Sequence, residues 1–486
     1  MAITPFDYQR RDLDLLKAHN YRGLLNLETG AGKTVEGVLS HVESGADVTL
    51  VIAPDQTHGS AWIPTFAKAG IEARPMGNRN KTTKAAYTDF QLGYPGVYLV
   101  TPQWFTREDI SEWTGDLLLV DESHGVMGPG SKGNRKLAGF SPKEAREALV
   151  TRFDGRMSLS GTALRNRFEY AWSQGRTLWP ELYERGQVAY DNFWSWQMDR
   201  MDYTEIYTNQ RDRFGNVKKV KKFLTEKVPG KWLGEAPLVI THFKRRQCCE
   251  FHPNGFLPMD EPTVIHETIP MTPAQKRAIR EMEDHLMTWL GDNPLVAEIP
   301  LTKNQRIRQM TLGVPKVVYD AEKDADTVEF DPECESPYLD WVLEFLDESD
   351  EPVVIYTDSQ RFAAVTTHRL NKAGIPAFEY SGATRKTRDE DAKQFGGKYR
   401  VIVAVLAAIA EGYDGLQKVA KTEVWLNTSL DGTINTQAEG RLDRIGQNGQ
   451  VLRIYLHDDL GISEGRFSEA VERRLALNRS LQKVPA

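Results

Sequence analysis

Short apolar runs fall into two sets along the chain, and segments of helix length separate the runs within each set. The first set comprises residues 23–27, 48–53, 97–101, 117–120 and 157–160, and the second comprises 353–357, 377–380, 401–405, 424–427 and 451–456. Buried parallel strands form continuous apolar runs, and parallel neighbours need helical crossovers. Each set therefore predicts an α/β domain with a parallel sheet, and the two domains are expected to form a cleft.

The stretch between the two sets, about residues 166–335, has a different pattern, with aromatic clusters and helix signals instead of strand runs. Thr272-Pro273-Ala274-Gln275 has the N-cap, first-turn proline and third-position glutamine of a helix start. We expect a helix from there to about Leu290. Residues 213–216 lie between polar runs and predict the turn of a basic hairpin.

Length and composition restrict the class of protein. At 486 residues the chain exceeds the roughly 250–300 residues that one core serves, so several domains are expected. The longest apolar run, residues 401–410, is about half of the roughly 20 residues that a membrane-spanning helix needs, and it predicts a buried strand running into a loop. Neither a signal-peptide pattern nor metal-ligand spacing of the three cysteines is present. We expect a cytoplasmic protein without membrane contact.

Charge is distributed unevenly around a formal net charge of -7. Residues 205–246 contain eleven Lys or Arg against four Asp or Glu, whereas residues 320–351 contain fourteen acidic residues against Lys323 alone. The basic segment predicts a surface that meets phosphates, and the acidic one a surface that repels them. The alternative is that both are ordinary solvated surface.

The chemistry begins after the first apolar run, where the sequence reads Thr29-Gly30-Ala31-Gly32-Lys33-Thr34 and continues as a helix. Glycines let backbone N–H groups turn toward a phosphate, and the helix N-terminus adds positive potential. Lys33 would reach the terminal phosphates, and the Thr34 hydroxyl would ligate Mg²⁺. Leu27 stands where a strict phosphate loop has glycine, yet the order strand, loop, helix predicts a site for ATP and Mg²⁺.

A second chemical element follows the run 117–120, which leads directly into Asp121 and Glu122. A magnesium-ATP site needs one acidic group to hold the metal and another to orient and deprotonate the attacking water. Asp121 is the candidate for the metal, and Glu122 is the candidate for the base. Without the phosphate loop, such a pair of acidic residues would equally be ordinary surface residues that follow a strand.

Asp121-Glu122-Ser123-His124 resembles the DEAH-type box of superfamily 2 helicases. Further segments resemble motifs of the Swi/Snf-type branch in the same chain order: residues 5–9, 51–54, 101–103, 159–166, 410–416 and 437–447. Ala163 and Arg165 depart from the usual proline and glutamine, and residues 353–358 match the fourth motif only in outline. The resemblance covers essentially the whole chain.

The resemblance implies an α/β fold with two tandem RecA-like (P-loop NTPase) domains, parallel sheets and helical insertions between them. The implied divisions are residues 1–170, insertions and a basic hairpin or linker at 171–335, a second RecA-like domain at 336–456, and a C-terminal helix at 457–486.

It also implies roles for individual residues. Gln9 would read adenine, and Glu411, Gly412 and Asp414 would contribute to nucleotide binding. DNA-backbone contacts would come from Pro54, Thr101 and Gln103, and coupling of the two sites from His124, Ser160, Gly161 and Thr162. Gln437, Arg441 and Arg444 would complete catalysis from the second domain.

Two assignments have a direct physical reason: the arginines of the second domain and the lysines of the basic segment. Arginines three residues apart on a helix share one face, and a guanidinium delivered from the opposite domain stabilises charge on the transferring phosphoryl group. ATP hydrolysis that depends on Arg441 and Arg444 would therefore require the two domains to close. Lysines neutralise phosphates without reading sequence, as a translocase requires, and the candidates are Lys218, Lys219, Lys221 and Lys222.

The sequence thus predicts an ATP-dependent DNA translocase or helicase that moves along duplex or branched DNA. One alternative is a strand-separating helicase on single-stranded DNA or RNA, and another is a nucleotide-gated DNA clamp without significant turnover. No accessory domain is visible, which is typical of a compact, monomeric bacterial or phage-encoded enzyme acting in the cytoplasm of the bacterium or infected host.

Overall fold

The computed structural model describes most of the chain: residues 3–28, 30–165, 167–183, 192–211, 217–242, 260–290, 293–296, 300–320, 325–410, 412–413, 415–444, 447–465, 467–469 and 471–472. The chain divides into two compact units. Unit 1 is built from residues before 259, and unit 2 from residues 259–472.

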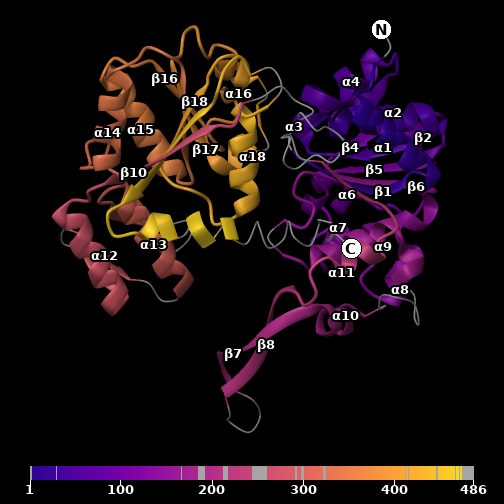
Figure 1. Ribbon diagram of the computed structural model, residues 1–486, viewed down its shortest axis with the longest axis horizontal. Coiled ribbons are helices and arrows are strands. Elements are labelled where there is room, and N and C mark those ends of the chain that lie inside the picture. Colours follow the sequence, from indigo (N-terminus) through magenta and orange to yellow (C-terminus); the bar gives the residue numbers. More distant parts are fainter. Residues whose placement is uncertain are drawn as a thin grey trace. The chain divides into compact units, whose positions relative to one another are not determined.

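Unit 1 contains a seven-stranded sheet with the order β3-β4-β2-β5-β6-β1-β9, in which every neighbouring pair is parallel (Figure 1). Its strands are β1 (Arg22–Leu27), β2 (Val48–Ile52), β3 (Ala73–Pro75), β4 (Gly96–Val100), β5 (Leu117–Asp121), β6 (Gly155–Ser160) and β9 (Val239–His242). Strands β2, β5 and the inner part of β4 are buried throughout and mostly apolar, as expected of a parallel sheet covered on both faces.

Helices of unit 1 cover this sheet and connect its strands. They are α1 (Asp7–Ala18), α2 (Lys33–Ser44), α3 (Asp55–Thr57), α4 (Ile63–Lys68), α5 (Lys81–Gln91), α6 (Pro102–Arg107), α7 (Lys132–Leu137), α8 (Pro142–Glu147), α9 (Tyr170–Leu178), α10 (Phe193–Arg200) and α11 (Lys231–Glu235). Side chains from α5, α6 and α7 form one core with alternate residues of β2, β4 and β5. Helices α2 and α9 contact β6, and α9 also contacts β1.

A long antiparallel hairpin is inserted between β6 and β9 in chain order. It consists of β7 (Met201–Arg211) and β8 (Val217–Glu226), which form a two-stranded sheet of their own. Within unit 1 the hairpin extends away from the seven-stranded sheet (Figure 1). The basic hairpin predicted from sequence is therefore present, although its predicted turn lies outside the described residues.

Unit 2 contains a six-stranded parallel sheet with the order β10-β19-β18-β15-β17-β16. Its strands are β10 (Thr263–Ile269), β15 (Val353–Thr357), β16 (Ala377–Tyr380), β17 (Val401–Val405), β18 (Thr422–Trp425) and β19 (Leu452–Asp458). The helices are α12 (Pro273–His285), α13 (Pro300–Leu312), α14 (Pro337–Asp347), α15 (Gln360–Lys372), α16 (Arg388–Ala392), α17 (Leu406–Ala410) and α18 (Gly432–Leu442). Two small hairpins accompany them, β11 (Met287–Leu290) with β12 (Asn293–Val296), and β13 (Lys316–Asp320) with β14 (Ala325–Glu329).

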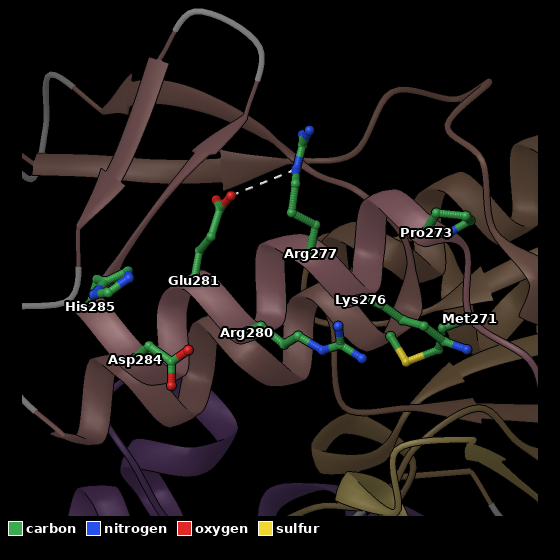
Figure 2. A pocket seen from close by; sticks show the side chains of 8 residues that line it. All are labelled: Met271, Pro273, Lys276, Arg277, Arg280, Glu281, Asp284 and His285. Carbon is green, nitrogen blue, oxygen red and sulfur yellow. Dashed lines mark ion pairs between the residues drawn. The ribbon is translucent and has the colours of Figure 1, made fainter.

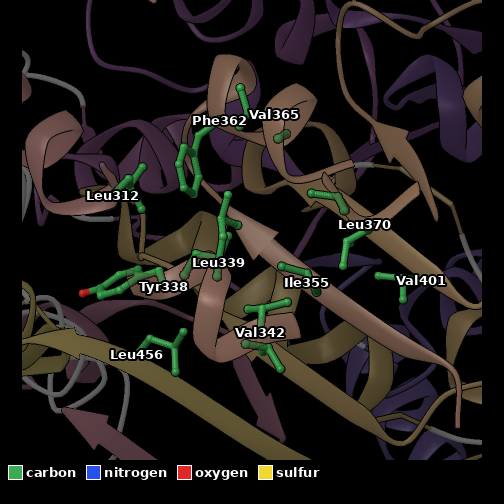
Figure 3. Close-up of a cluster of buried hydrophobic side chains, with 14 of the residues drawn as sticks. Leu312, Tyr338, Leu339, Val342, Ile355, Phe362, Val365, Leu370, Val401 and Leu456 are labelled. Carbon is green, nitrogen blue, oxygen red and sulfur yellow. The ribbon is translucent and has the colours of Figure 1, made fainter. Parts of the chain in front are cut away.

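Separate apolar cores lie on the two faces of the unit 2 sheet. One face packs against α14 and α15 through buried residues such as Leu339, Val342 and Phe362 (Figure 3). The other packs against α16, α17 and α18, with Ala438 and Leu442 among its buried members. Successive strand residues alternate between the two cores, as the two-residue period of a strand requires.

These topologies confirm the predicted fold class, α/β with two units that each contain a parallel sheet. All ten predicted strands are present, with ends within two residues of those expected. None of the helices in the described part of the chain is long and apolar enough to cross a membrane. The divisions predicted at residues 170, 335 and 456 stay predictions.

Three local predictions were wrong. The region 166–335 contains more strands than the predicted hairpin, because β9 joins the first sheet, β10 joins the second, and the hairpins β11–β12 and β13–β14 follow β10. The helix at Thr272 begins with the predicted reciprocal cap but ends at His285, since Leu286 has a left-handed φ of 58°. The apolar run 401–410 continues from β17 into the short helix α17 instead of a loop.

Candidate active site

The loop between β1 and α2 has the backbone of a phosphate-binding turn. Gly30 and Gly32 have φ angles of 88° and 84°, in the left-handed region that glycine adopts at little cost. The N–H of Ala31 donates to the carbonyl of Glu28 at 2.9 Å, which closes the turn, and α2 begins directly at Lys33. Thr34 lies in the first turn of that helix, while Thr29 lies outside the described residues.

Helix α1 supports this loop from one side. The hydroxyl of Tyr8 donates to the carbonyl of Ala31 at 2.8 Å, and Nε2 of Gln9 lies 3.5 Å from the carbonyl of Gly32. A Cβ added at Gly32 would lie 2.5 Å from Nε2 at the end of the Gln9 side chain, which would have to shift, so glycine is favoured here chiefly by the φ of 84°. Oε1 of Gln9 accepts from the N–H of Phe6 at 2.9 Å. The structure thus links Gln9 to the loop backbone, and adenine reading by this residue stays a prediction.

Lys33 extends from the start of α2 toward the end of β5. Its Nζ donates to the carbonyl of Leu27 at 3.1 Å and lies 3.9 Å from Oε1 of Glu122. The separation from Glu122 is at the outer limit of an ion pair, which leaves room for a change of partner. The two sequence motifs are therefore brought together in space, although 88 residues separate Lys33 from Asp121 (121 − 33).

Asp121 is the last residue of β5 and is only 5% exposed. The indole Nε1 of Trp62 donates to its Oδ2 at 2.9 Å, and the N–H of Glu122 donates to its Oδ1 at 2.9 Å. Burial, followed by the negative charge of Glu122, raises the pKa of Asp121 to about 6, whereas Lys33 and Trp62 oppose this rise. The two hydrogen bonds therefore fix the orientation of the Asp121 carboxylate, whereas the neighbouring groups compensate only part of its negative charge.

Glu122 has an unusual backbone. Its φ and ψ are 43° and 50°, the left-handed conformation that non-glycine residues adopt at a cost of about 1–2 kcal/mol. Such outliers cluster at functional sites, where the surrounding structure holds them in place. The conformation turns the chain sharply after the buried strand, and the Glu122 carboxylate remains partly exposed.

A polar network connects Glu122 to the end of β6. Nδ1 of His124 lies 3.4 Å from Oε2 of Glu122 and 3.4 Å from Oγ of Ser160, whose hydroxyl donates to the same Glu122 oxygen at 3.4 Å. The N–H of Thr162 donates to Ser160 Oγ at 3.1 Å, and Thr162 Oγ1 lies 3.5 Å from His124 Nδ1. Of the predicted coupling residues, His124 and Ser160 therefore contact the predicted base directly, and Thr162, next to Gly161, joins it through these two.

Gln174 of α9 is a second tie between these loops, and the sequence analysis missed it. Its Nε2 donates to Ser123 Oγ at 2.9 Å and to the carbonyl of Ala163 at 3.1 Å, while its Oε1 accepts from Ser158 Oγ at 2.6 Å. The side chain is fully buried. A buried glutamine with satisfied hydrogen bonds fixes the two loops relative to each other. No motif signal identifies it, because its partners come from distant parts of the sequence.

The residues present fit a magnesium nucleotide. The turn at Gly30 and Gly32 opens backbone N–H groups at the N-terminus of a twelve-residue helix, where anions are stabilised. The partly compensated carboxylate of Asp121 is the oxygen ligand that Mg²⁺ prefers. Thr34 and Asp121 would hold the metal, and Lys33 would meet the terminal phosphates.

The predicted DNA-backbone residues of unit 1 lie at one edge of its sheet. Pro54 caps α3 just after β2, and Thr101 caps α6 just after β4, where its Oγ1 accepts from the N–H of Trp104 at 3.2 Å. Since β2 and β4 are parallel neighbours, the two caps follow adjacent strand ends. Gln103 is exposed in the first turn of α6. These positions follow the same strand edge as Asp121 and the phosphate loop.

The lysines of the hairpin are not part of this cluster. Lys219 and Lys222 are exposed on β8, and Lys219 lies 3.5 Å from Glu205. Lys221 places its Nζ 4.1 Å from the ring centre of Tyr203 and 3.5 Å from the sulfur of Met198. Lys218 belongs to β8, but its side chain lies outside the described residues.

Unit 2 holds the remaining predicted residues. Gln437 is buried on α18, and Arg441, on the same helix, donates to the carbonyl of Ala410. A Cβ added at Gly412 would lie 2.5 Å from the Tyr380 hydroxyl, so this position is closely packed. Glu411 and Asp414 lie outside the described residues.

The helix expected to align the two arginines is shorter than predicted. Helix α18 ends at Leu442, and its cap Asp443 has a ψ of 74°, so Arg444 lies beyond the helix. The prediction that a single helix face carries both Arg441 and Arg444 is therefore wrong. The N–H of Arg444 instead donates to the carbonyl of Leu442 at 3.0 Å, in a tight turn.

A separate surface pocket of about 410 Å³ lies along α12 of unit 2 (Figure 2). Its charged side chains have both signs, and Arg277 and Glu281 form an ion pair at 3.8 Å within it. Among the described residues, none of the predicted site residues lines this pocket. The described residues contain no cluster of three or more metal-ligating side chains.

Comparison with known proteins gives a structural match only. No protein-family model matches the sequence, and no curated protein matches it. Among the solved structures that match is the Sulfolobus solfataricus SWI2/SNF2 ATPase core in complex with dsDNA, with 14% identity and a TM-score of 0.40. The match covers 100% of this chain and 98% of that chain. At this identity and score, function has to be argued from the residues themselves.

Proposed function

We propose that this chain is an ATPase that uses hydrolysis to move along DNA and remodel it. The observation that carries the proposal is the convergence of Lys33, Asp121 and Glu122 on a glycine turn, with Glu122 in a strained conformation and tied to Ser160. A binding-only site needs neither a positioned second carboxylate nor its strained backbone.

Each residue has one proposed task. The loop N–H groups and Lys33 bind and orient the phosphates, and Asp121 and Thr34 hold the metal through oxygen. The Glu122 carboxylate orients the attacking water and accepts its proton. A bound magnesium nucleotide would supply the reactive phosphoanhydride bond and compensate the charge that Asp121 and Glu122 bring together.

The coupling to DNA is proposed from two further features. The first is the network of His124, Ser160 and Thr162, which joins the proposed base to the loop after β6. The second is the set of strand-end positions at Pro54, Thr101 and Gln103, which follow the same edge of the sheet. A DNA backbone bound along that edge would act on Glu122 through neighbouring loops.

Arg441 and Arg444 are proposed to act on the same nucleotide from unit 2, together with Gln437. A guanidinium in that role stabilises charge that develops in the transition state, and it adds little to ground-state binding. Lys33→Ala should therefore weaken nucleotide binding, whereas Arg444→Ala should leave binding largely intact and stop turnover. Equal loss of binding in the two variants would refute the arrangement.

The central test is ATP hydrolysis by the wild type and by Glu122→Gln, each with and without duplex DNA. We expect stimulation of the wild type by DNA and a rate about 10²–10⁴-fold lower in Glu122→Gln, as for loss of a general base. The matched control is Glu72→Gln, an exposed glutamate in unit 1, which should hydrolyse like the wild type. Equal rates in all conditions would refute the proposal. Comparing the stimulation by duplex, forked and single-stranded DNA and by RNA identifies the nucleic acid along which the protein moves.

A further inference from the structure

The β7–β8 hairpin has two chemically different faces, which the strand register assigns. Tyr203 pairs with Phe223 and Glu205 pairs with Lys221, and these side chains share one face. Thr204 pairs with Lys222 on the opposite face. The hairpin pairs with no other described strand, so neither face is covered by a further sheet neighbour.

The first face combines exposed aromatic surface with positive charge. Tyr203 is 38% exposed, and its ring centre lies 6.0 Å from that of Phe223 in an edge-to-face arrangement. Lys221 lies over the Tyr203 ring with its Nζ 4.1 Å from the centre. We call Tyr203, Lys221 and Phe223 the aromatic-cationic face.

Packing alone does not account for these residues. A two-stranded hairpin has no core of its own and is marginally stable in water, so the exposed ring of Tyr203 and the partly exposed ring of Phe223 are costly to leave in solvent without burying much area. Strand β8 carries four lysines, and its single acidic residue, Glu226, is buried and accepts from the N–H groups of Gly230 and Trp232. The exposed part of β8 is therefore positive, in a chain whose net charge is -7.

The occupant that fits is a nucleic-acid strand with unpaired bases. Rings on a basic surface stack against bases, while neighbouring lysines meet the phosphates, whichever sequence is present. Paired bases are stacked on each other inside a duplex and offer such rings nothing to stack on. Duplex DNA would therefore use the lysines but not Tyr203 and Phe223.

We propose that the aromatic-cationic face of the β7–β8 hairpin binds unpaired nucleotides of DNA, with bases against Tyr203 and Phe223 and phosphates against the lysines. The inference rests on the proposed function, in that DNA is the track. It adds that the DNA bound by this protein includes single-stranded or branched DNA, and that a surface outside the ATP site binds the separated strand.

The test measures DNA binding by the full chain without nucleotide, by fluorescence anisotropy with a labelled oligothymidylate and a labelled blunt duplex. Tyr203→Leu should weaken oligothymidylate binding about 5- to 150-fold, the range for loss of one stacked base, with little change for the duplex. Lys221→Gln should lower the slope of log affinity against log salt by about 0.7 on the single strand. Thr204→Ala, on the opposite face, is the matched control and should bind like the wild type.

Two further variants separate stacking from damage to the hairpin. Tyr203→Phe keeps the ring and should retain single-strand affinity, and the indole emission of Tyr203→Trp should be quenched by oligothymidylate but not by duplex. Equal loss on both DNAs in Tyr203→Leu, or no loss on the single strand, would overturn the inference. If the wild type instead binds single strands through the rings but does not hydrolyse ATP, the proposed function fails and the binding face stands.

Discussion

Trp62→Phe tests whether the direction of the Asp121 carboxylate matters for metal binding. Trp62 is fully buried, and its indole N–H is the donor to Asp121 Oδ2 at 2.9 Å. A hydrogen bond to a charged group contributes about 1.5–3 kcal/mol, and each 1.36 kcal/mol corresponds to a factor of ten. Losing it should raise the Mg²⁺ concentration for half-maximal ATPase activity by about 10- to 150-fold. Phenylalanine keeps most of the apolar volume but has no N–H.

The assay is a Mg²⁺ titration of ATP hydrolysis at fixed nucleotide, repeated with Mg²⁺-free nucleotide binding. Metal-free binding should change little, because the hydrogen bond that is lost goes to Asp121, the proposed metal ligand, and not to the groups proposed to meet the phosphates. Trp113→Phe is the matched control, since Trp113 is equally buried in unit 1 and its indole nitrogen has no hydrogen-bond partner among the described residues. An unchanged Mg²⁺ dependence in Trp62→Phe, or an equal change in Trp113→Phe, would refute the reasoning.

Three other predictions follow from local geometry. Burial, followed by the neighbouring His266, lowers the pKa of His457. Below about pH 6.5 the unfolded chain binds a proton at this residue that the folded protein resists, so the stability of the fold falls as the pH drops. His457→Gln should lose less Tm than the wild type between pH 7.5 and 5.5, and an equal loss would contradict this. Gly139→Ala should lower the free energy of unfolding by more than about 2 kcal/mol, because the φ of Gly139 is 72° and the new Cβ would lie 2.3 Å from a backbone nitrogen of α8. Gly70→Ala is the control, since Gly70 has a φ of 78° but open space around it, and it should cost about 1 kcal/mol. Thermal unfolding measures both. Ser160→Ala should keep nucleotide binding but lose stimulation of ATPase activity by DNA, and full stimulation would exclude a coupling role.

The strands and the phosphate loop were predictable because their signals are local. A buried parallel strand is a continuous apolar run, and the turn at Gly30 and Gly32 needs glycine whatever the rest of the chain does. The capped start of α12 was predictable for the same reason, because Thr272 and Gln275 bond within one turn. Its end was not, since the left-handed Leu286 has no residue signature.

Features made by distant contacts were not predictable. Trp62 lies on a π-helical turn and reaches Asp121 across 59 residues, and Gln174 reaches Ser123 across 51. Strand β9 is too short for its apolar content to mark it, and its place beside β1 is set by the sheet edge available to it. The end of α18 before Arg444 shows the same limit, because spacing on an ideal helix assumes that the helix continues.

Strand order gives the hairpin a mechanical connection to the nucleotide loop. The insertion that contains the hairpin leaves unit 1's sheet from β6 and returns through β9, and these are the two neighbours of β1. Both pairings are parallel, so a pull on the insertion loads the hydrogen bonds of β1 in shear from both sides. The last residue of β1, Leu27, is paired with His242 and accepts a bond from Lys33. The hairpin is therefore connected along the chain to both strands that flank β1, and β1 ends at the carbonyl that holds the lysine of the phosphate loop.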